Sequence, residues 1–136
     1  MLPCLLLLLG QGSVFGTLLS QEPRRDICQR GTSMTIQCEA DTQVSLMYWY
    51  RQLPGQSLIL IATANQDMEA TYESGFTKEK FPISRPTLMF SNLTVNNMSF
   101  EDSSFYFCSA DRVNRDTLHF GEGTRLTVVE NLEKVK

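Results

Sequence analysis

The side chains of this sequence that could do chemistry are four cysteines and a single histidine among 136 residues. The cysteines are Cys4, Cys28, Cys38 and Cys108, and the histidine is His119. No nucleophile, orienting carboxylate or metal-ligand cluster accompanies His119 at a recognisable spacing, so neither catalysis nor a metal or cofactor site is expected. Cysteines can instead form disulfides or stay buried. We therefore expect a binding protein and not an enzyme.

Cysteine, tryptophan, tyrosine and glycine recur at a characteristic spacing along most of the chain. Cys108 follows Cys38 by seventy residues, and Trp49 lies eleven residues after Cys38. The segment DSSFYF at 102–107 directly precedes Cys108, and FGEG at 120–123 begins twelve residues beyond it. This order and spacing resemble those of an immunoglobulin variable domain. The resemblance implies an all-β fold, an immunoglobulin-like V-type sandwich of two antiparallel sheets.

The same resemblance implies specific contacts in the core. In this fold a disulfide joins the two sheets beside a buried tryptophan, so Cys38 and Cys108 are expected to pair against Trp49. Tyr106 stands where the fold uses a tyrosine whose hydroxyl bonds to upstream backbone. Closing a loop of this length contributes on the order of 4 kcal/mol to stability in the chain-entropy model.

Two further features follow from the match. Lys80 occupies the place where the family has a basic residue facing the carboxylate of Asp102, and lysine cannot form the two-pronged pair that arginine makes. Gly121 and Gly123 lie where the last strand needs backbone freedom for a local bulge.

Alternating apolar and polar residues indicate the strands that must position these groups. Leu93, Val95 and Met98 are expected to face inward, and Asn92 and Thr94 outward. The pair Pro54-Gly55 is expected to end the strand at residues 48–52. The expected strands cover residues 34–38, 48–52, 58–61, 105–108 and 124–129.

The two ends of the chain differ in character from its middle. Residues 1–16 carry no charged side chain and contain a leucine run, which indicates a secretory signal peptide cleaved after Gly16. Residues 17–129 then suit one immunoglobulin V-type domain. A net charge of −3 and a pI near 5.1 argue against nucleic acid as a partner. Partners are therefore expected to be proteins.

Short sequence motifs indicate which kind of variable domain this is. YWYRQ at 48–52 with Pro54-Gly55 resembles a T-cell receptor variable segment. Residues 120–129 resemble a beta joining segment, and residues 130–136 resemble the truncated start of a beta constant region. The chain is thus identified as a member of the T-cell receptor beta chains, with a rearranged variable domain. A non-rearranging V-set adhesion or inhibitory domain is the alternative, which stable monomeric behaviour would favour.

Membership of this family implies a place and partners. The chain would act at the extracellular face of the plasma membrane, with its anchor outside this sequence. It would form a heterodimer with a T-cell receptor alpha chain, bind peptide–MHC, and couple to invariant signalling subunits through other parts of the receptor.

By match to the family, three loops at one end of the sandwich bind antigen, at residues 42–46, 64–70 and 109–119. The first two contact the MHC helices in such receptors, and the third lies over the peptide. Expected antigen contacts are Thr42, Gln43, Val44, Ser45, Leu46, Ala64, Asn65, Gln66, Asp67, Met68, Glu69, Ala70, Asp111, Arg112, Val113, Asn114 and Arg115.

The third loop has two readings. Arg112 and Arg115 favour an acidic peptide residue as target, since arginine offers charge-assisted, bidentate contact. Equally, these arginines could pair in solvent with Asp111 and Asp116, where each pair contributes little.

The family pairs with its second variable domain through one sheet face. Tyr50 alternates with Trp49, and Phe107 alternates with Cys108, so both aromatics are expected to face away from the core. An exposed aromatic face needs a partner. The residues expected at the alpha-chain interface are Tyr50, Gln52, Pro54, Leu58, Phe107 and Phe120.

Two kinds of residue remain outside these sites. Cys28 is expected to lack a partner in the mature chain, because Cys4 would leave with the signal peptide; such a thiol is either reactive or buried, and we favour a buried one. Asn92 and Asn97 each begin an N-glycosylation sequon, with Asn97 the better acceptor because it lies in a turn.

Overall fold

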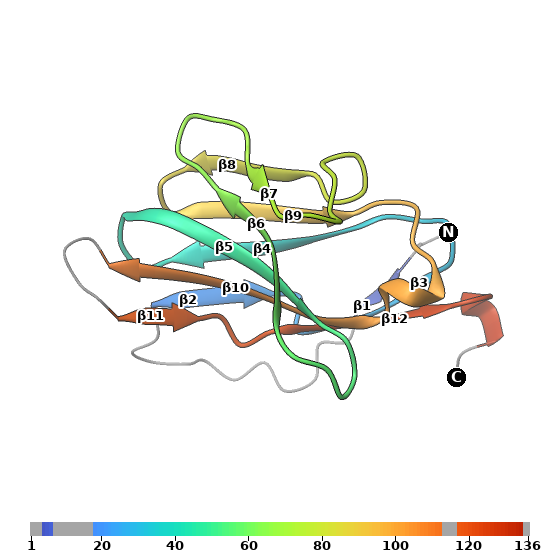
Figure 1. Cartoon of the computed structure of the whole chain (residues 1–136). Helices are drawn as coiled ribbons and strands as arrows, with labels where there is room; N and C mark the ends of the chain where they lie inside the picture. Colours follow the sequence, from blue (N-terminus) through green and yellow to red (C-terminus); the bar gives the residue numbers. More distant parts are fainter. Residues whose placement is uncertain (1–3, 7–17, 113–116, 135–136) are drawn as a thin grey trace.

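Two β-sheets packed face to face make up the part of the chain that the computed structural model describes, residues 4–6, 18–112 and 117–134 (Figure 1). The larger sheet has the order β1-β3-β12-β10-β5-β6-β7, with β11 paired to β10, and the smaller has the order β2-β4-β9-β8. Neighbouring strands are antiparallel except β3 and β12, which are parallel. The expected all-β sandwich is therefore confirmed.

The larger sheet is made of β1 (Cys4–Leu6), β3 (Arg25–Gln29), β5 (Val44–Gln52), β6 (Ile59–Ala64), β7 (Thr71–Tyr72), β10 (Ser104–Arg112), β11 (Leu118–Phe120) and β12 (Thr124–Val129). The smaller sheet is made of β2 (Leu19–Glu22), β4 (Met34–Ala40), β8 (Ile83–Thr87) and β9 (Phe90–Val95). Short 3-10 helices are η1 (Phe100–Asp102) and η2 (Leu132–Lys134). Among the described residues, no helix is long and apolar enough to cross a membrane.

Strand β4 shows how the sequence pattern makes a two-layered fold. Met34, Ile36, Cys38 and Ala40 are buried, and the residues between them are exposed. Successive side chains of a strand point to opposite faces, so one face of β4 enters the core and the other meets solvent. The strand expected at 34–38 is confirmed and extends two residues further.

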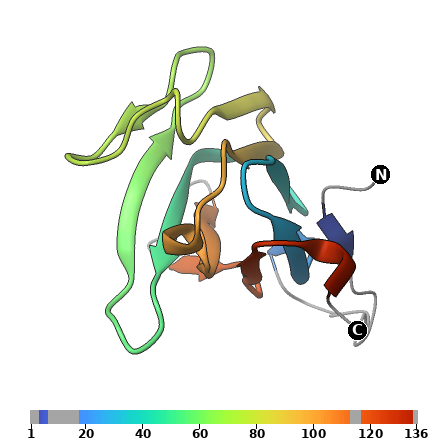
Figure 2. The same ribbon diagram turned by 90° about the vertical axis from the view of Figure 1, so that its right-hand side faces the viewer.

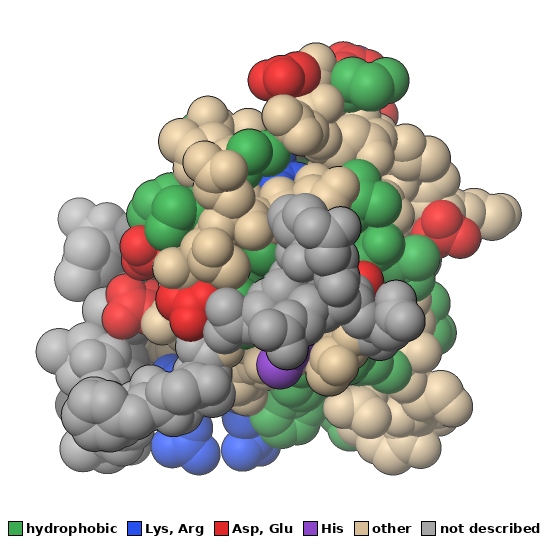
Figure 3. All heavy atoms as spheres, turned by 90° about the vertical axis from the view of Figure 1, so that its left-hand side faces the viewer, with side chains coloured by type: hydrophobic (Ala, Val, Ile, Leu, Met, Phe, Trp, Pro, Cys, Tyr) green, Lys and Arg blue, Asp and Glu red, His purple; other side chains and the backbone are tan. Residues whose placement is uncertain are grey.

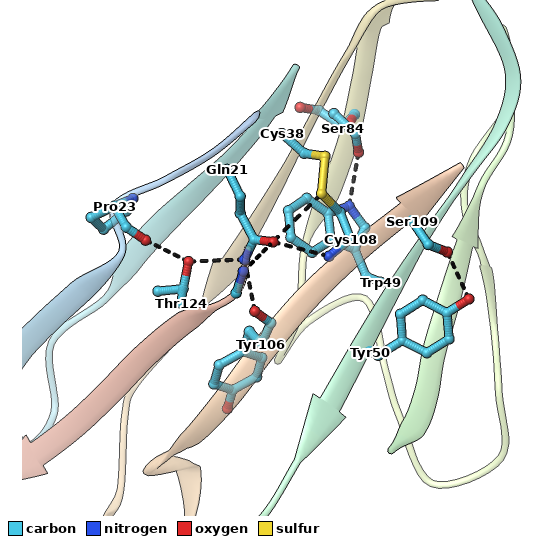
Figure 4. Close-up of a disulfide and its surroundings, with 12 residues drawn as sticks. Gln21, Pro23, Cys38, Trp49, Tyr50, Ser84, Tyr106, Cys108, Ser109 and Thr124 are labelled. Atoms are coloured by element: carbon cyan, nitrogen blue, oxygen red, sulfur yellow. Dashed lines mark hydrogen bonds between the residues drawn. A yellow bond between two sulfur atoms is a disulfide. The ribbon is translucent and has the colours of Figure 1, made fainter. Parts of the chain in front are cut away.

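The core centres on one disulfide and one tryptophan (Figure 4). Cys38 of β4 is bonded to Cys108 of β10, and Trp49 of β5 is fully buried. The indole Nε1 of Trp49 donates to Ser91 Oγ at 2.9 Å, and that hydroxyl donates to the Ser84 carbonyl at 2.9 Å. The expected inter-sheet disulfide and buried tryptophan are both present.

Gln21 joins the sheets a second time through its buried carboxamide (Figure 4). Its Nε2 donates to the Tyr106 carbonyl at 2.7 Å and to Thr124 Oγ1 at 2.9 Å. Its Oε1 accepts from the backbone N–H groups of Cys108 at 3.3 Å and Gly123 at 3.2 Å. One side chain of β2 thus holds both β10 and β12 in place, a contact that the sequence analysis missed.

Near η1, the expected ion pair and tyrosine contact are present. Lys80 Nζ lies 2.7 Å from Asp102 Oδ2 and also donates to the carbonyls of Asn96 and Asn97 at 2.8 and 3.1 Å. The Tyr106 hydroxyl donates to the Asp102 carbonyl at 2.8 Å. Burial, followed by the charge of Asp102, raises the pKa of that hydroxyl.

The state of Cys28 depends on whether residues 1–16 are present. In the whole chain it is bonded to Cys4, and β1 pairs antiparallel with β3 so that the two cysteines lie opposite each other. The prediction of an unpaired Cys28 applies to the chain after residues 1–16 are removed, so it stays a prediction, as does that removal. Most of residues 1–16 lies outside the described residues.

Candidate functional site

At one end of the sandwich, on the left of Figure 1, strands β4 and β10 end, strands β5 and β11 begin, and the β6–β7 connection lies at the same end. The three segments that the sequence analysis assigned to antigen include the connections between these strands. Figure 3 views this end directly. Antiparallel strands of both sheets terminate there, so segments far apart in sequence form one surface.

The first loop is shorter than expected. Strand β5 begins at Val44, whose side chain is only 1% exposed and belongs to the core. Val44 is therefore a core residue and not a surface contact. Thr42 is half-buried, Gln43 and Ser45 are exposed, and Leu46 is exposed at the end of this segment.

The second loop is closed by its own hydrogen bonds. Ala64 ends β6 and is buried, and Ala70 is partly buried against the core. Asn65 Nδ2 donates to the Glu69 carbonyl at 2.9 Å and to Thr71 Oγ1 at 2.7 Å. This bonding leaves an exposed tip made of Gln66, Asp67, Met68 and Glu69, in which Met68 is 72% exposed.

The third loop connects β10 and β11, whose register runs from Ser109↔Phe120 to Asp111↔Leu118. Arg112 is the last residue of β10 and pairs with Val44 of β5. Burial, followed by the Asp111 carboxylate, raises the pKa of the neighbouring Tyr48 hydroxyl. Outside the described residues lie the expected contacts Val113, Asn114 and Arg115, together with Asp116.

His119 is half-buried in β11, and Figure 3 shows a histidine, in purple, at this end. It pairs with Ala110 of β10. Elsewhere in the described residues, Cys4, Asp26 and Cys28 lie close enough together to hold a metal ion. Both cysteines are in a disulfide, so their sulfurs are not thiolate ligands. Among the described residues, this end of the sandwich offers exposed side chains of the first and second loops for contact with a partner.

The outer face of the larger sheet carries the aromatic residues expected at the pairing interface. The rings of Tyr50 and Phe120 lie 5.2 Å apart between centroids, and the Tyr50 hydroxyl is 2.7 Å from Ser109 Oγ (Figure 4). Phe107 lies opposite Tyr50 in the β5–β10 ladder. The side chain of Phe120 is wholly apolar, yet 42% of it is exposed to solvent. We call the outer side of β5, β10 and β11 the pairing face.

The turn between β5 and β6 projects from one side of the sandwich, as Figure 2 shows. Gln52 Nε2 donates to the Gln56 carbonyl at 3.2 Å within this turn, and Pro54 and Leu58 are exposed. Phe105 lies opposite Gln52 on the same face and is exposed. Leu118, opposite Asp111, is exposed as well.

Phe105 and Leu118 are apolar members of the pairing face that the sequence analysis missed. The alternation that placed Phe107 outward also places Phe105 outward, so a signal was available for one of them. Leu118 had no such signal, because its strand has only three residues.

The two sequons have different surroundings. Asn97 is exposed in the turn after β9, with a left-handed φ of 42°. Asn92 is half-buried on β9, where its Nδ2 donates to Ser84 Oγ at 3.3 Å and its Oδ1 is buried without a partner. Glycosylation of either residue stays a prediction, and the environment favours Asn97.

Comparison with known proteins places the chain in the class of immunoglobulin V-set domains, because residues 21–129 match the model of that family. The human T cell receptor beta variable 29-1 is 71% identical over 111 residues, which span 82% of this chain and all of that protein. The human T cell receptor beta variable 20-1 is 54% identical over 78% of this chain and 96% of its own length. The chain belongs to the T-cell receptor beta variable family and is by homology a beta subunit of such a receptor.

A solved structure agrees with this assignment. It has a TM-score of 0.80 and 46% sequence identity, and the match covers 84% of this chain and all of that chain. Its study concerns the structural basis of T cell specificity and activation by the bacterial superantigen toxic shock syndrome toxin-1.

Proposed function

We propose that this chain is the antigen-recognition subunit of an alpha/beta T-cell receptor. It pairs with an alpha chain through the pairing face and binds peptide presented by MHC molecules through the three loops. The observation that carries the proposal is the exposed aromatic face beside a loop-bearing end. Family membership supports both parts.

The chemistry of the pairing face supports a protein partner. Tyr50, Phe105 and Phe120 place aromatic surface on one face, with the amide of Gln52 at its margin. Interfaces between proteins combine an aromatic centre with a polar rim in this way. An apolar surface of this kind left open to water would promote non-specific association.

The finer parts of the proposal come from the sequence. Residues 1–16 direct secretion, residues 111–115 form the junction of a rearranged gene, and residues 130–136 begin a constant region. The receptor stands at the outer face of the plasma membrane, and the signalling subunits are reached through parts of the receptor outside this sequence.

Pairing is tested by refolding the full chain with a panel of alpha variable domains and measuring product mass by light scattering. We expect a one-to-one heterodimer. Phe120→Ala should weaken pairing by about tenfold or more, because a central aromatic is removed from the interface. Phe100→Ala is the matched control: Phe100 is 53% exposed but lies on η1, outside the pairing face. A stable monomer indifferent to every alpha domain would contradict the proposal and favour a self-sufficient V-set adhesion domain.

Antigen binding is tested separately with the heterodimer against a panel of peptide–MHC molecules. Replacing Arg112 and Arg115 by alanine should weaken binding to a ligand with an acidic central peptide residue by about tenfold, because two charge-assisted contacts are lost. Unchanged affinity would exclude the acidic-residue contact and leave the arginines paired with Asp111 and Asp116. Binding to no member of a broad panel would count against peptide–MHC as the ligand.

A further inference from the structure

Arg85 on β8 reaches from the smaller sheet to the larger one at the loop-bearing end. A guanidinium carries five N–H groups, and here five backbone carbonyls lie within hydrogen-bond distance, so the donors and acceptors match in number. The contacts are Nε to Thr87 at 3.2 Å, Nη1 to Ser45 at 3.2 Å and Ala64 at 2.7 Å, and Nη2 to Val44 at 2.8 Å and Leu88 at 2.9 Å.

The carbonyls that Arg85 binds belong to the segments that frame the loops. Val44 and Ser45 begin β5, beyond the point where the β5–β6 ladder starts at Met47↔Ala64. Ala64 is the last residue of β6. Because β6 ends there, it offers no further N–H groups to the first residues of β5. The bonds to the Val44, Ala64 and Leu88 carbonyls are partly buried, and those to Ser45 and Thr87 are exposed. A carbonyl shielded from water costs free energy when it lacks a donor, and the guanidinium supplies that donor to the first three.

Local sequence explains why Arg85 points inward. Strand β8 is an edge strand, paired with β9 alone, and its register with β9 is irregular between Ser84 and Thr87. Pro86 follows Arg85 and has no N–H to donate, which edge strands tolerate. Ile83, two residues before Arg85, packs against the core, and alternate residues of a strand face the same side, so Arg85 also faces inward.

The charge of Arg85 is met by backbone dipoles. Within the described residues, the four ion pairs are formed by other cations. Burial lowers the pKa of the guanidinium, which stays charged because arginine does not deprotonate in proteins. Hydrogen bonds from a charged donor are stronger than neutral ones.

We propose that Arg85 is a positioning residue for the recognition end. It fixes the start of β5, the end of β6 and the β8–β9 turn in one arrangement. Val44, one of its acceptors, also pairs with Arg112 at the base of the third loop. The proposal rests on the proposed function for the claim that these loops bind a ligand. Loops already ordered lose less entropy on binding, so Arg85 raises affinity without touching the ligand.

The test is amide hydrogen exchange of the full chain without a ligand. Arg85→Met removes every donor and keeps most of the side-chain volume, and Arg85→Lys keeps the charge with three donors. Lys80→Met is the matched control. Lys80 also binds two backbone carbonyls, but at Asn96 and Asn97, beyond the opposite end of β9.

Arg85→Met should speed exchange about tenfold or more in residues 42–46, 64–70 and 87–89, because several charge-assisted bonds to these segments are lost. Arg85→Lys should restore part of the protection. Lys80→Met should leave these segments unchanged and speed exchange around residues 96–102. A uniform increase in Arg85→Met, or the same pattern in both methionine variants, would overturn the proposal.

A second readout separates this proposal from the proposed function. Arg85 lies outside the pairing face, so Arg85→Lys should pair with an alpha domain as the unmodified chain does. If Arg85→Met fails to fold, the exchange pattern of Arg85→Lys decides the outcome: faster exchange confined to the three segments supports positioning, and unchanged exchange excludes it. If the unmodified chain pairs with no alpha domain, the proposed function fails while the exchange result stands.

Discussion

Two buried polar side chains, Gln21 and Asp26, differ in how fully their polar atoms are hydrogen-bonded. The carboxamide of Gln21 has partners for both its nitrogen and its oxygen. Asp26 on β3 is only 7% exposed, and its Oδ1 is buried without a hydrogen-bond partner. Burial raises the pKa of Asp26 from 3.8 to about 6, against a smaller lowering by a backbone hydrogen bond from Ile27. The neutral carboxyl is therefore the form that suits the fold.

This shift predicts a pH dependence of stability. Between pH 4 and 6 the unfolded chain has lost the Asp26 proton and the folded chain still holds it. The stabilisation that Asp26 gives through its raised pKa is full below the pKa of the unfolded chain, and it is lost as pH rises through about 6. The free energy of unfolding, measured with denaturant, should fall by about 1–3 kcal/mol as pH rises across this window. Asp26→Asn should remove this fall, and Asp67→Asn, in the exposed second loop, should keep it. An identical pH profile for Asp26→Asn and the unmodified chain would contradict the assignment.

Between elements, the junction of β11 and β12 depends on the absence of a side chain. A Cβ at Gly121 would lie 2.5 Å from Gln21 Oε1 and 3.0 Å from Cys108 Sγ. Gly123 has a left-handed φ of 94°, and its N–H bonds to the same Oε1. The segment therefore passes directly over the carboxamide that bridges the sheets. Glycine at 121 is needed for this close approach.

Gly121→Ala should consequently displace Gln21 and break its bonds to β10 and β12. We expect a loss of about 2–4 kcal/mol in denaturant unfolding, because overpacking and unsatisfied buried groups act together. In a Gln21→Ala background the cost should be smaller, with a coupling of about 0.5–3 kcal/mol. Gly75→Ala is the control: its Cβ meets nothing within 4 Å, so its cost should add to that of Gln21→Ala. Simple additivity for Gly121→Ala would show that the contact does not matter.

For the molecule as a whole, local motifs predicted the fold and its core well. The Cys38–Cys108 bond, buried Trp49 and the Lys80–Asp102 pair all lie where the sequence indicated. Strand β12 coincides with the expected 124–129. Each of these features depends on particular residue types at fixed spacings along the chain, so it can be recognised in a single sequence.

Other parts could not be predicted from the sequence, because they depend on where strands end in space. Val44 and Ala64 resemble loop residues, yet tertiary packing extends β5 and β6 over them. Arg85 resembles an exposed residue of an edge strand, and its acceptors come from segments up to 41 residues away. Within the candidate site, alternation placed Tyr50 and Phe107 but gave no information on residues 113–116.

The hairpin of β10 and β11 has a consequence for diversity. Its register is set by three pairs, from Ser109↔Phe120 to Asp111↔Leu118, and the first pair places Phe120 against Tyr50. Under the proposed function, the residues between Arg112 and Leu118 differ from one receptor to another, while the three pairs keep Phe120 against Tyr50. One framework of strands can therefore carry many different binding loops beside the same pairing face.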